Sequence, residues 1–211
     1  MLTYITDEYE DLEALRGAVS ITDHNFYVSQ SDLLYGGAVI QNNLEDQILK
    51  DLIMTVVYYD EDDFVTGLGS QYIDYLFPGD TLGLSPYFNT PPEGADPSRY
   101  TAYIFPGDVV DDYELTENIF QVTGSELTGD FDDQVKVTFT NTYTKQVSEV
   151  DIYALVYDKD GIIIGGGSTY LDEPIPAGGT GEIEVYAFYD SDLTVSDIMV
   201  WVVPSYYTAF E

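Results

Sequence analysis

The sequence predicts an all-β protein made of two tandem antiparallel β-sandwiches that follow a short N-terminal helix. Three observations lead to this prediction. Apolar and polar residues alternate with a period of two in segment after segment. Turn-forming residues separate these segments about every 8–12 positions, as in β-sandwiches. The chain also repeats itself at an offset of 98 residues.

The repeat sets the expected domain boundaries. Residues 43–83 align with residues 141–181 without a gap, and 11 of these 41 positions are identical. Asn43 aligns with Asn141, and most of the other matches are glycines, aspartates and tyrosines. These residue types set turns and pack on pleated surfaces, so the match indicates a shared backbone path. We therefore expect an N-terminal segment over residues 1–25, a first sandwich over 26–110, a linker over 111–117 and a second sandwich over 118–211.

The N-terminal segment carries the one helical pattern. Asp7 and Glu10 have the spacing of a capping box, with Leu12 and Leu15 at helical spacing behind them. Gly17 is a typical helix stop. The pattern predicts a short acidic helix before the first strand.

The strands follow from the alternation. In residues 150–157 one face carries apolar side chains at every second position, and the first copy has the same inner row. Asp158 to Gly161 then form a tight hairpin turn, with Ile162 to Ile164 starting the return strand. The inner rows are Val150, Ile152, Ala154 and Val156 in the second copy, and Leu52, Met54, Val56 and Tyr58 in the first. Further strands are expected around residues 135–139, 182–189 and 200–203.

The charge excludes several classes of partner. The chain has 39 acidic and six basic side chains in 211 residues, a formal net charge of −33. A nucleic-acid binder needs a basic stripe, and docking on an anionic membrane needs basic residues too. No apolar run reaches the roughly 20 residues of a membrane span. We expect a protein without nucleic-acid partners or a membrane span, adapted to a cation-rich exterior.

Two interpretations of the location stay open. The N-terminus is acidic and lacks the basic region of a signal peptide. The protein is therefore either cytosolic, or a secreted protein whose leader is absent from this chain. The richness in tyrosine, aspartate and glycine favours the extracellular or cell-surface location.

The aspartate turns are the candidate metal site. Asp60, Asp62 and Asp63 in the first copy, and Asp158 and Asp160 in the second, resemble the start of a calcium loop. The glutamate that would close such a loop is missing after Gly161. A hairpin turn whose aspartates bond their own backbone is the simpler interpretation. Apart from calcium we expect no cofactor, and a second acidic cluster, Asp130, Asp132 and Asp133, is interpreted in the same way.

The tyrosines are the candidate binding surface. The chain has 20 of them, and in strands they are typical of core and rim packing. The alternative is an exposed patch that recognises a protein or a glycan. Its expected members, on one sheet of the second copy, are Tyr153, Tyr157, Tyr170, Tyr186 and Tyr189.

Little in the sequence points to catalysis. His24 is the only histidine, and the chain has no cysteine. Cysteine nucleophiles, thiolate metal sites and disulfides are therefore excluded. No nucleophile-elbow serine or phosphate-binding loop occurs. We expect no enzymatic activity.

The strand-turn segment resembles the FxLYD domain of bacterial and archaeal surface proteins and lipoproteins. Ala154-Leu155-Val156-Tyr157-Asp158 carries the Tyr-Asp of that signature, with Ala and Val at its Phe and Leu positions. Val56 to Asp60 departs similarly, Pro78-Gly79 matches its later turn, and Asp63 stands where the second copy has Gly161. The resemblance implies an immunoglobulin-like sandwich in each copy and no shared catalytic residues.

These observations favour a non-enzymatic structural, adhesion or ligand-presenting module at the cell surface. One alternative is a filament subunit that self-associates by donating a strand, with residues 1–6 or 204–211 as donors. The other alternative is a weak calcium-dependent binding module. The partner class, protein or glycan, stays open at this point.

Overall fold

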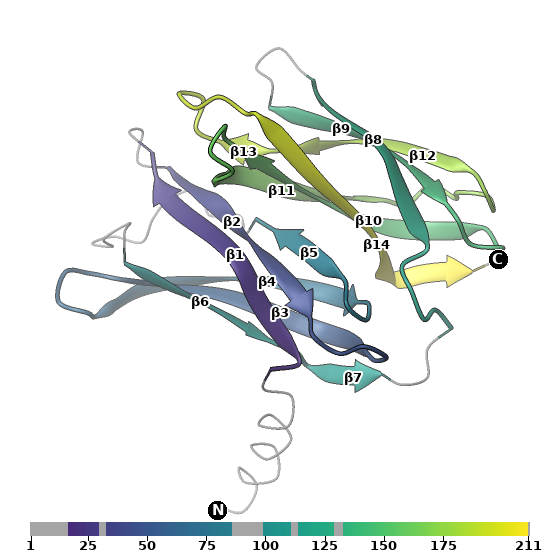
Figure 1. Ribbon diagram of the computed structural model, residues 1–211, viewed down its shortest axis with the longest axis horizontal. Helices are drawn as coiled ribbons and strands as arrows, with labels where there is room; N and C mark the ends of the chain where they lie inside the picture. The colour runs from purple at the N-terminus through teal and green to yellow at the C-terminus, as the bar shows by residue number, and fades with distance from the viewer. Residues whose placement is uncertain (1–16, 30–32, 86–98, 111–113, 129–132, 211) are drawn as a thin grey trace, which may run out of the picture.

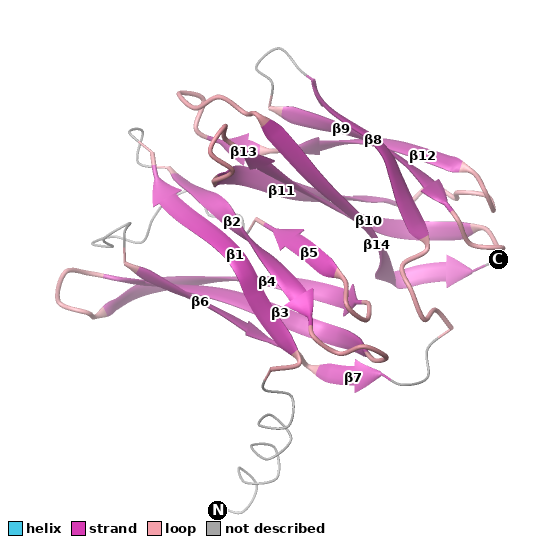
Figure 2. Ribbon diagram, viewed as in Figure 1, coloured by secondary structure: helices cyan, strands magenta, loops and turns pink. Residues whose placement is uncertain are grey.

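The structure is a computed structural model that describes residues 17–29, 33–85, 99–110, 114–128 and 133–210. All strand pairs in these ranges are antiparallel, and the described chain contains no helix (Figures 1 and 2). The all-β prediction is thus confirmed. The predicted N-terminal helix falls on residues that lie outside the described ranges. Within those ranges, no helix has the length and apolarity that a bilayer crossing requires.

Fourteen strands make up the described fold. The first seven are β1 (Val19–Val28), β2 (Leu34–Asn42), β3 (Ile48–Tyr59), β4 (Val65–Leu76), β5 (Thr81–Leu84), β6 (Tyr100–Phe105) and β7 (Asp108–Val110). The second seven are β8 (Phe120–Thr128), β9 (Gln134–Asn141), β10 (Val147–Tyr157), β11 (Ile163–Leu171), β12 (Thr180–Tyr186), β13 (Phe188–Tyr189) and β14 (Asp197–Phe210). β1 begins within the residues that the repeat assigned to the N-terminal segment.

The two halves of the chain build their sheets in the same order. Strands β1-β2-β5 form one sheet, and β8-β9-β12 form its counterpart. The other sheets are β4-β3-β6, with β7 continuing beside β3, and β13-β11-β10-β14. In both halves the fifth strand returns beside the second after two strands have passed to the other sheet, which is a Greek-key connection.

The alternating residues form the cores between facing sheets. Leu52, Met54, Val56 and Tyr58 lie in one apolar cluster with side chains of β2 and β5. Val150, Ile152, Ala154 and Val156 lie in a second cluster with side chains of β9 and β12. All eight are at most 1% exposed. Both predicted inner rows are therefore confirmed.

A buried asparagine ends the second strand of each half. Asn42 donates its side-chain N–H to the Gln47 carbonyl at 2.8 Å, and Asn141 donates to the Lys145 carbonyl at 2.9 Å. Both asparagines are fully buried, whereas Asn43 is exposed. The structural counterpart of Asn141 is thus Asn42, and the sequence pairing with Asn43 is wrong by one position. The loop after Asn42 is one residue longer, and this shift is invisible in an ungapped alignment.

The two halves lie against each other, as Figure 1 shows. The outer face of β1-β2-β5 packs on the outer face of the sheet that contains β10 and β11. Val39 of β2 joins Leu155 and Tyr157 of β10 and Ile163 of β11 in a separate apolar cluster. The four sheets therefore stack as layers, with β4-β3-β6 at one end and β8-β9-β12 at the other.

Candidate functional site

The contact between the halves covers the part of one sheet face that is centred on β10. We call this part the covered face; its members on β10 and β14 are Asp151, Tyr153, Leu155, Tyr157, Trp201 and Val203. Farther out on the same side of the sheet, Met199 of β14 and Tyr170 of β11 are 45% and 69% exposed. Tyr153 and Tyr157 are 5% and 7% exposed. Glycines of the opposing sheet allow the close approach, because a Cβ on Gly83 would collide with the Trp201 ring. A Cβ on Gly37 would lie 2.6 Å from Leu155 Cδ2.

Polar contacts also join the two halves. The Asn25 side chain donates to the Ile163 carbonyl at 2.7 Å, and the Tyr27 hydroxyl donates to the Ile164 carbonyl at 2.9 Å. These bonds pair β1 side chains with the backbone of β11. A half-buried donor that lost such a partner would be left unsatisfied, so the bonds oppose separation of the halves.

The covered face corrects the predicted tyrosine patch. Tyr153 and Tyr157 are buried beneath the first half, while Tyr170 is 69% exposed on β11. Tyr186 is 55% exposed but lies on β12 in a different sheet, and Tyr189 lies on the edge strand β13. The structure therefore does not bring the five tyrosines into one exposed patch. The period-two pattern placed Tyr153 and Tyr157 on the outward face of β10 correctly, but it did not show what packs on that face.

No described part of the chain covers the matching face of the first half. We call its central part the open face; it consists of eight outward residues of β4-β3-β6, namely Ile53, Thr55, Val57, Leu68, Ser70, Tyr72, Tyr103 and Phe105. The next outward positions of β3 and β4 are the acidic residues Asp51 and Asp74. Tyr72 is 71% exposed, Leu68 65%, Phe105 52% and Tyr103 41%. These four side chains expose roughly 450 Å² of surface, which is as large as the largest apolar patch of a typical monomer.

The open-face residues of β3 and β6 correspond to the covered-face residues of β10 and β14. Tyr103 opposes Thr55 on β3 just as Trp201 opposes Tyr153 on β10, and each pair is offset by 98 residues. The Tyr103 and Phe105 rings stack with centroids 6.1 Å apart and planes 17° from parallel. None of the eight open-face residues is charged. The sequence held one signal for this face: β4 carries apolar side chains on both sides.

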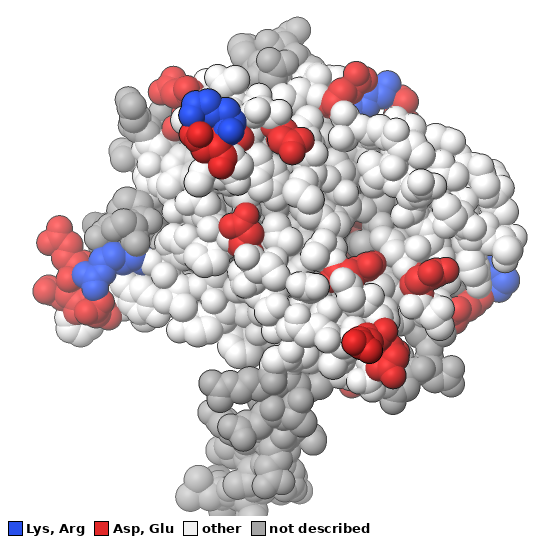
Figure 3. Space-filling view, viewed as in Figure 1, with Lys and Arg blue, Asp and Glu red and all other residues white. Residues whose placement is uncertain are grey.

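The charges lie elsewhere on the surface. Each of the five basic residues in the described ranges forms an ion pair with an acidic neighbour. The pairs are Lys50–Asp51, Arg99–Asp63, Lys136–Glu182, Lys145–Glu114 and Lys159–Asp160. Figure 3 shows the basic side chains of that view lying beside acidic ones, with further acidic side chains scattered between them. The described surface therefore offers no cationic patch.

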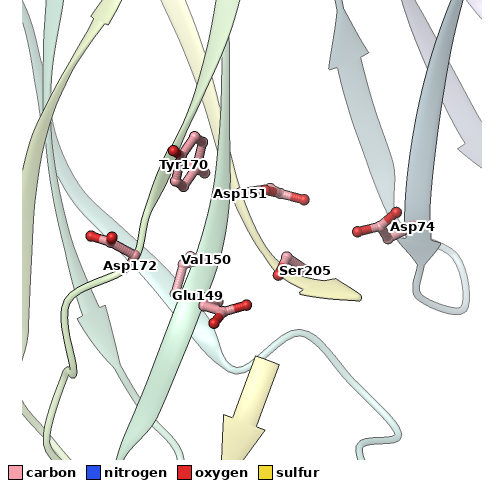
Figure 4. Close-up of a pocket in the computed structure, with 7 residues that line it drawn as sticks. All are labelled: Asp74, Glu149, Val150, Asp151, Tyr170, Asp172 and Ser205. Carbon is pink, nitrogen blue, oxygen red and sulfur yellow. The ribbon is translucent and has the colours of Figure 1, made fainter. Parts of the chain in front are cut away.

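An acidic cleft of about 440 Å³ lies at the boundary between the halves. Figure 4 shows Asp151 of β10 and Asp74 of β4 pointing toward each other across it. Burial, together with the negative charge of Asp74, raises the pKa of Asp151 to about 7. The cleft is also lined by Glu149, Val150, Tyr170, Asp172 and Ser205.

The cleft was not predicted from the sequence. The available signal was Asp151 itself, an acidic residue in an otherwise apolar outward row with Tyr153 and Leu155. An aspartate with a pKa of about 7 is mostly protonated below that pH, which removes one charge from the boundary there. The described residues contain no group of three or more His, Asp or Glu side chains arranged to hold a metal ion.

The aspartate turns have the geometry of hairpin turns whose aspartates bond their own backbone, which is the simpler of the two interpretations. Asp60 Oδ1 accepts the backbone N–H groups of Asp62 and Phe64, both at 2.9 Å. Asp158 Oδ1 accepts those of Asp160 and Ile162 at the same distance. Asp63 and Asp160 are paired with Arg99 and Lys159. Calcium binding at these turns stays a prediction, and Asp130 and Asp132 lie outside the described residues.

His24 has a local partner. It lies exposed on β1, and its Nδ1 is 2.9 Å from the Tyr100 hydroxyl. The two rings also meet edge to face, with centroids 5.6 Å apart. The histidine is thus a surface residue of a strand.

Comparisons with known proteins give no family. No family model matches the chain, and no curated protein matches it. Among solved structures, it is similar to the transglutaminase of red sea bream, with 11% identity and a TM-score of 0.22. That match covers 95% of this chain and 34% of the transglutaminase, so the chain spans about a third of that protein's length.

Proposed function

We propose that the chain is a non-enzymatic adhesion module made of two tandem immunoglobulin-like β-sandwich domains of the FxLYD type. The second domain carries the first as one rigid body, and the first domain presents the open face to a partner. The proposed domains comprise β1–β7 and β8–β14.

The sheet orders support the domain assignment. Each half has a sheet of its first, second and fifth strands facing a sheet centred on its third strand, with a Greek-key return between them. The backbone supports it too, because Asp51 and Glu149 share a positive φ at matching positions of β3 and β10. Asp63 likewise adopts the positive φ that Gly161 adopts in the second hairpin.

The open face is the observation that carries the proposed function. A monomeric protein with a charge of −33 has ample polar residues with which to cover a sheet face. This one instead exposes four large apolar side chains there, two of them stacked aromatics. Exposed apolar patches of this size mark interaction sites, and tyrosine is favoured in recognition surfaces.

The charge supports a location at the cell exterior. The acidic surplus repels itself in the compact state, and dissolved cations relieve that repulsion. The five basic side chains in the described ranges already form ion pairs. The remaining negative charge is therefore screened by dissolved ions. A medium rich in salt or divalent ions therefore suits this surface best.

The experiment is a surface-binding assay with matched variants. Beads that carry the wild-type chain are presented to arrays of extracellular glycans and matrix proteins, and to beads that carry the same chain. The double variant Tyr72→Ser, Phe105→Ser is expected to lose at least ten-fold in retained beads, since it removes half of the exposed apolar side chains. Gln121→Ser on β8 serves as the control and is expected to bind like wild type. Equal binding by all three forms would overturn the proposed function.

A further inference from the structure

We infer that the partner of the open face is the open face of a second copy of this chain, packed across a two-fold axis. This inference rests on the proposed function, because it uses the same face for binding. According to this inference, a β-sheet packs on the open face, rather than a small ligand or a loop.

The covered face shows what packs on a sheet of this kind. Its residues on β10 and β14 match the open-face residues of β3 and β6, and inside the chain they are covered by another β-sheet. Leu155 and Trp201 make that contact, and their counterparts are Val57 and Tyr103 on the open face. Sheet-on-sheet packing is thus already realised once in this molecule on an equivalent surface.

Among the outer sheet faces of a second copy, one has the right chemistry. The outward face of β1-β2-β5 is already occupied by the second half. The outward face of β8-β9-β12 carries Lys136, Glu182 and Glu184, and burying these against apolar side chains would remove their hydration without full compensation. The eight residues of the open face are uncharged, and the acidic neighbours Asp51 and Asp74 lie at one end of it. It can therefore pack on itself, and a two-fold arrangement closes after two copies.

The area of the open face sets the expected affinity of the dimer. Two copies would bury about 900 Å² in total, close to the roughly 1,000 Å² that separates weak from stable interfaces. Each copy also carries a charge of −33, located off the face. The dimer is therefore expected to be weak at low ionic strength and to tighten as salt screens the repulsion, since about 1 M salt shortens the screening length to about 3 Å.

Charge-swapped variants test the pairing directly. Ser70 is exposed in the middle of the open face, where its hydroxyl lies 2.9 Å from that of Thr55. Ser70→Glu and Ser70→Lys each place like charges in the interface, so each variant alone is expected to dimerise at least ten-fold more weakly than wild type. An equimolar mixture of the two variants is expected to recover dimers. The readout is sedimentation velocity across a concentration series in low salt and in about 1 M NaCl.

The control pair is Gln121→Glu and Gln121→Lys on the exposed strand β8, which are expected to dimerise like wild type. Circular dichroism on every variant checks that the fold is retained. A wild-type chain that stays monomeric in high salt overturns the inference. Dimers that survive both Ser70 variants, or a mixture that recovers none, overturn it as well. A monomer that still loses array binding in the Tyr72→Ser, Phe105→Ser variant leaves the proposed function standing with another partner.

Discussion

The buried asparagines show how single residues hold each half together. The side-chain N–H groups of Asn141 donate to the backbone carbonyls of Lys145, Ile175 and Pro176. Its side-chain oxygen Oδ1 accepts the backbone N–H of Tyr143. Asn42 plays the same part in the first half. Each asparagine thereby ties the end of a central strand to two loops, so these residues are structural.

Replacing Asn42 by alanine is expected to lower the free energy of unfolding by about 2–4 kcal/mol, since it leaves buried carbonyls unsatisfied. Chemical denaturation measures the change. The neighbouring variant Asn43→Ala removes an exposed side chain and is expected to cost less than about 1 kcal/mol. Equal effects of the two variants would contradict the assignment of Asn42 as the counterpart of Asn141.

Asp151 gives the protein a pH dependence with a defined sign. Its folded-state pKa of about 7 lies above its ordinary value of 3.8. The folded state therefore binds the proton more tightly, and this contribution to stability is complete below about pH 4 and is lost as the pH rises through 7. The variant Asp151→Asn cannot lose a proton at this position.

The difference in melting temperature between Asp151→Asn and wild type is thus expected to grow in favour of the variant from pH 4 to pH 8. Measuring the difference removes the effect of the other carboxylates, which both proteins share. The control Gln121→Ser, which exchanges one exposed neutral side chain on β8 for another, is expected to show a difference that is flat with pH. A flat profile for Asp151→Asn would mean that this carboxyl is not buried in the folded protein.

At the scale of elements, the strands and hairpins were predictable and their outer partners were not. Alternation fixed the inner rows of β3 and β10, and Asp158 to Gly161 fixed a turn, because both depend on neighbouring residues only. The outward row of β10 is also apolar, and such a row is equally consistent with a binding surface and with a second packed layer. Only the arrangement in space shows that Tyr153 and Tyr157 are covered while Tyr72 and Tyr103 are not.

The glycines of β2 and β5 let the two halves approach. Gly83→Val is expected to lower stability by about 1–3 kcal/mol, because the added side chain collides with Trp201. Trp201 is the one tryptophan of the chain, so its fluorescence emission reports on this contact and is expected to shift to longer wavelength. The control Gly124→Val has open space around it and is expected to change neither quantity. An unchanged emission in Gly83→Val would count against the contact.

At the scale of the whole molecule, charge opposes compactness. With a net charge of −33 and every described basic residue already paired, salt screens far more repulsion than attraction. The melting temperature of wild type is expected to rise by several degrees between about 10 mM and 1 M NaCl. Measuring it at low protein concentration separates this effect from dimerisation. A melting temperature that falls with added salt would contradict the role assigned to the surface charge.

The central claim is that the outward residues of β10 and β14 are covered inside the chain, whereas the equivalent residues of β3 and β6 are open. Hydroxyl-radical footprinting with mass spectrometry tests it most directly, on dilute protein in low salt. Tyr72 and Tyr170 occupy matching positions and are 71% and 69% exposed, so both are expected to be labelled and provide the internal calibration. On the same scale Tyr103 is expected to be labelled, and Tyr153 protected. Labelling of Tyr153 as fast as that of Tyr103 would contradict the account.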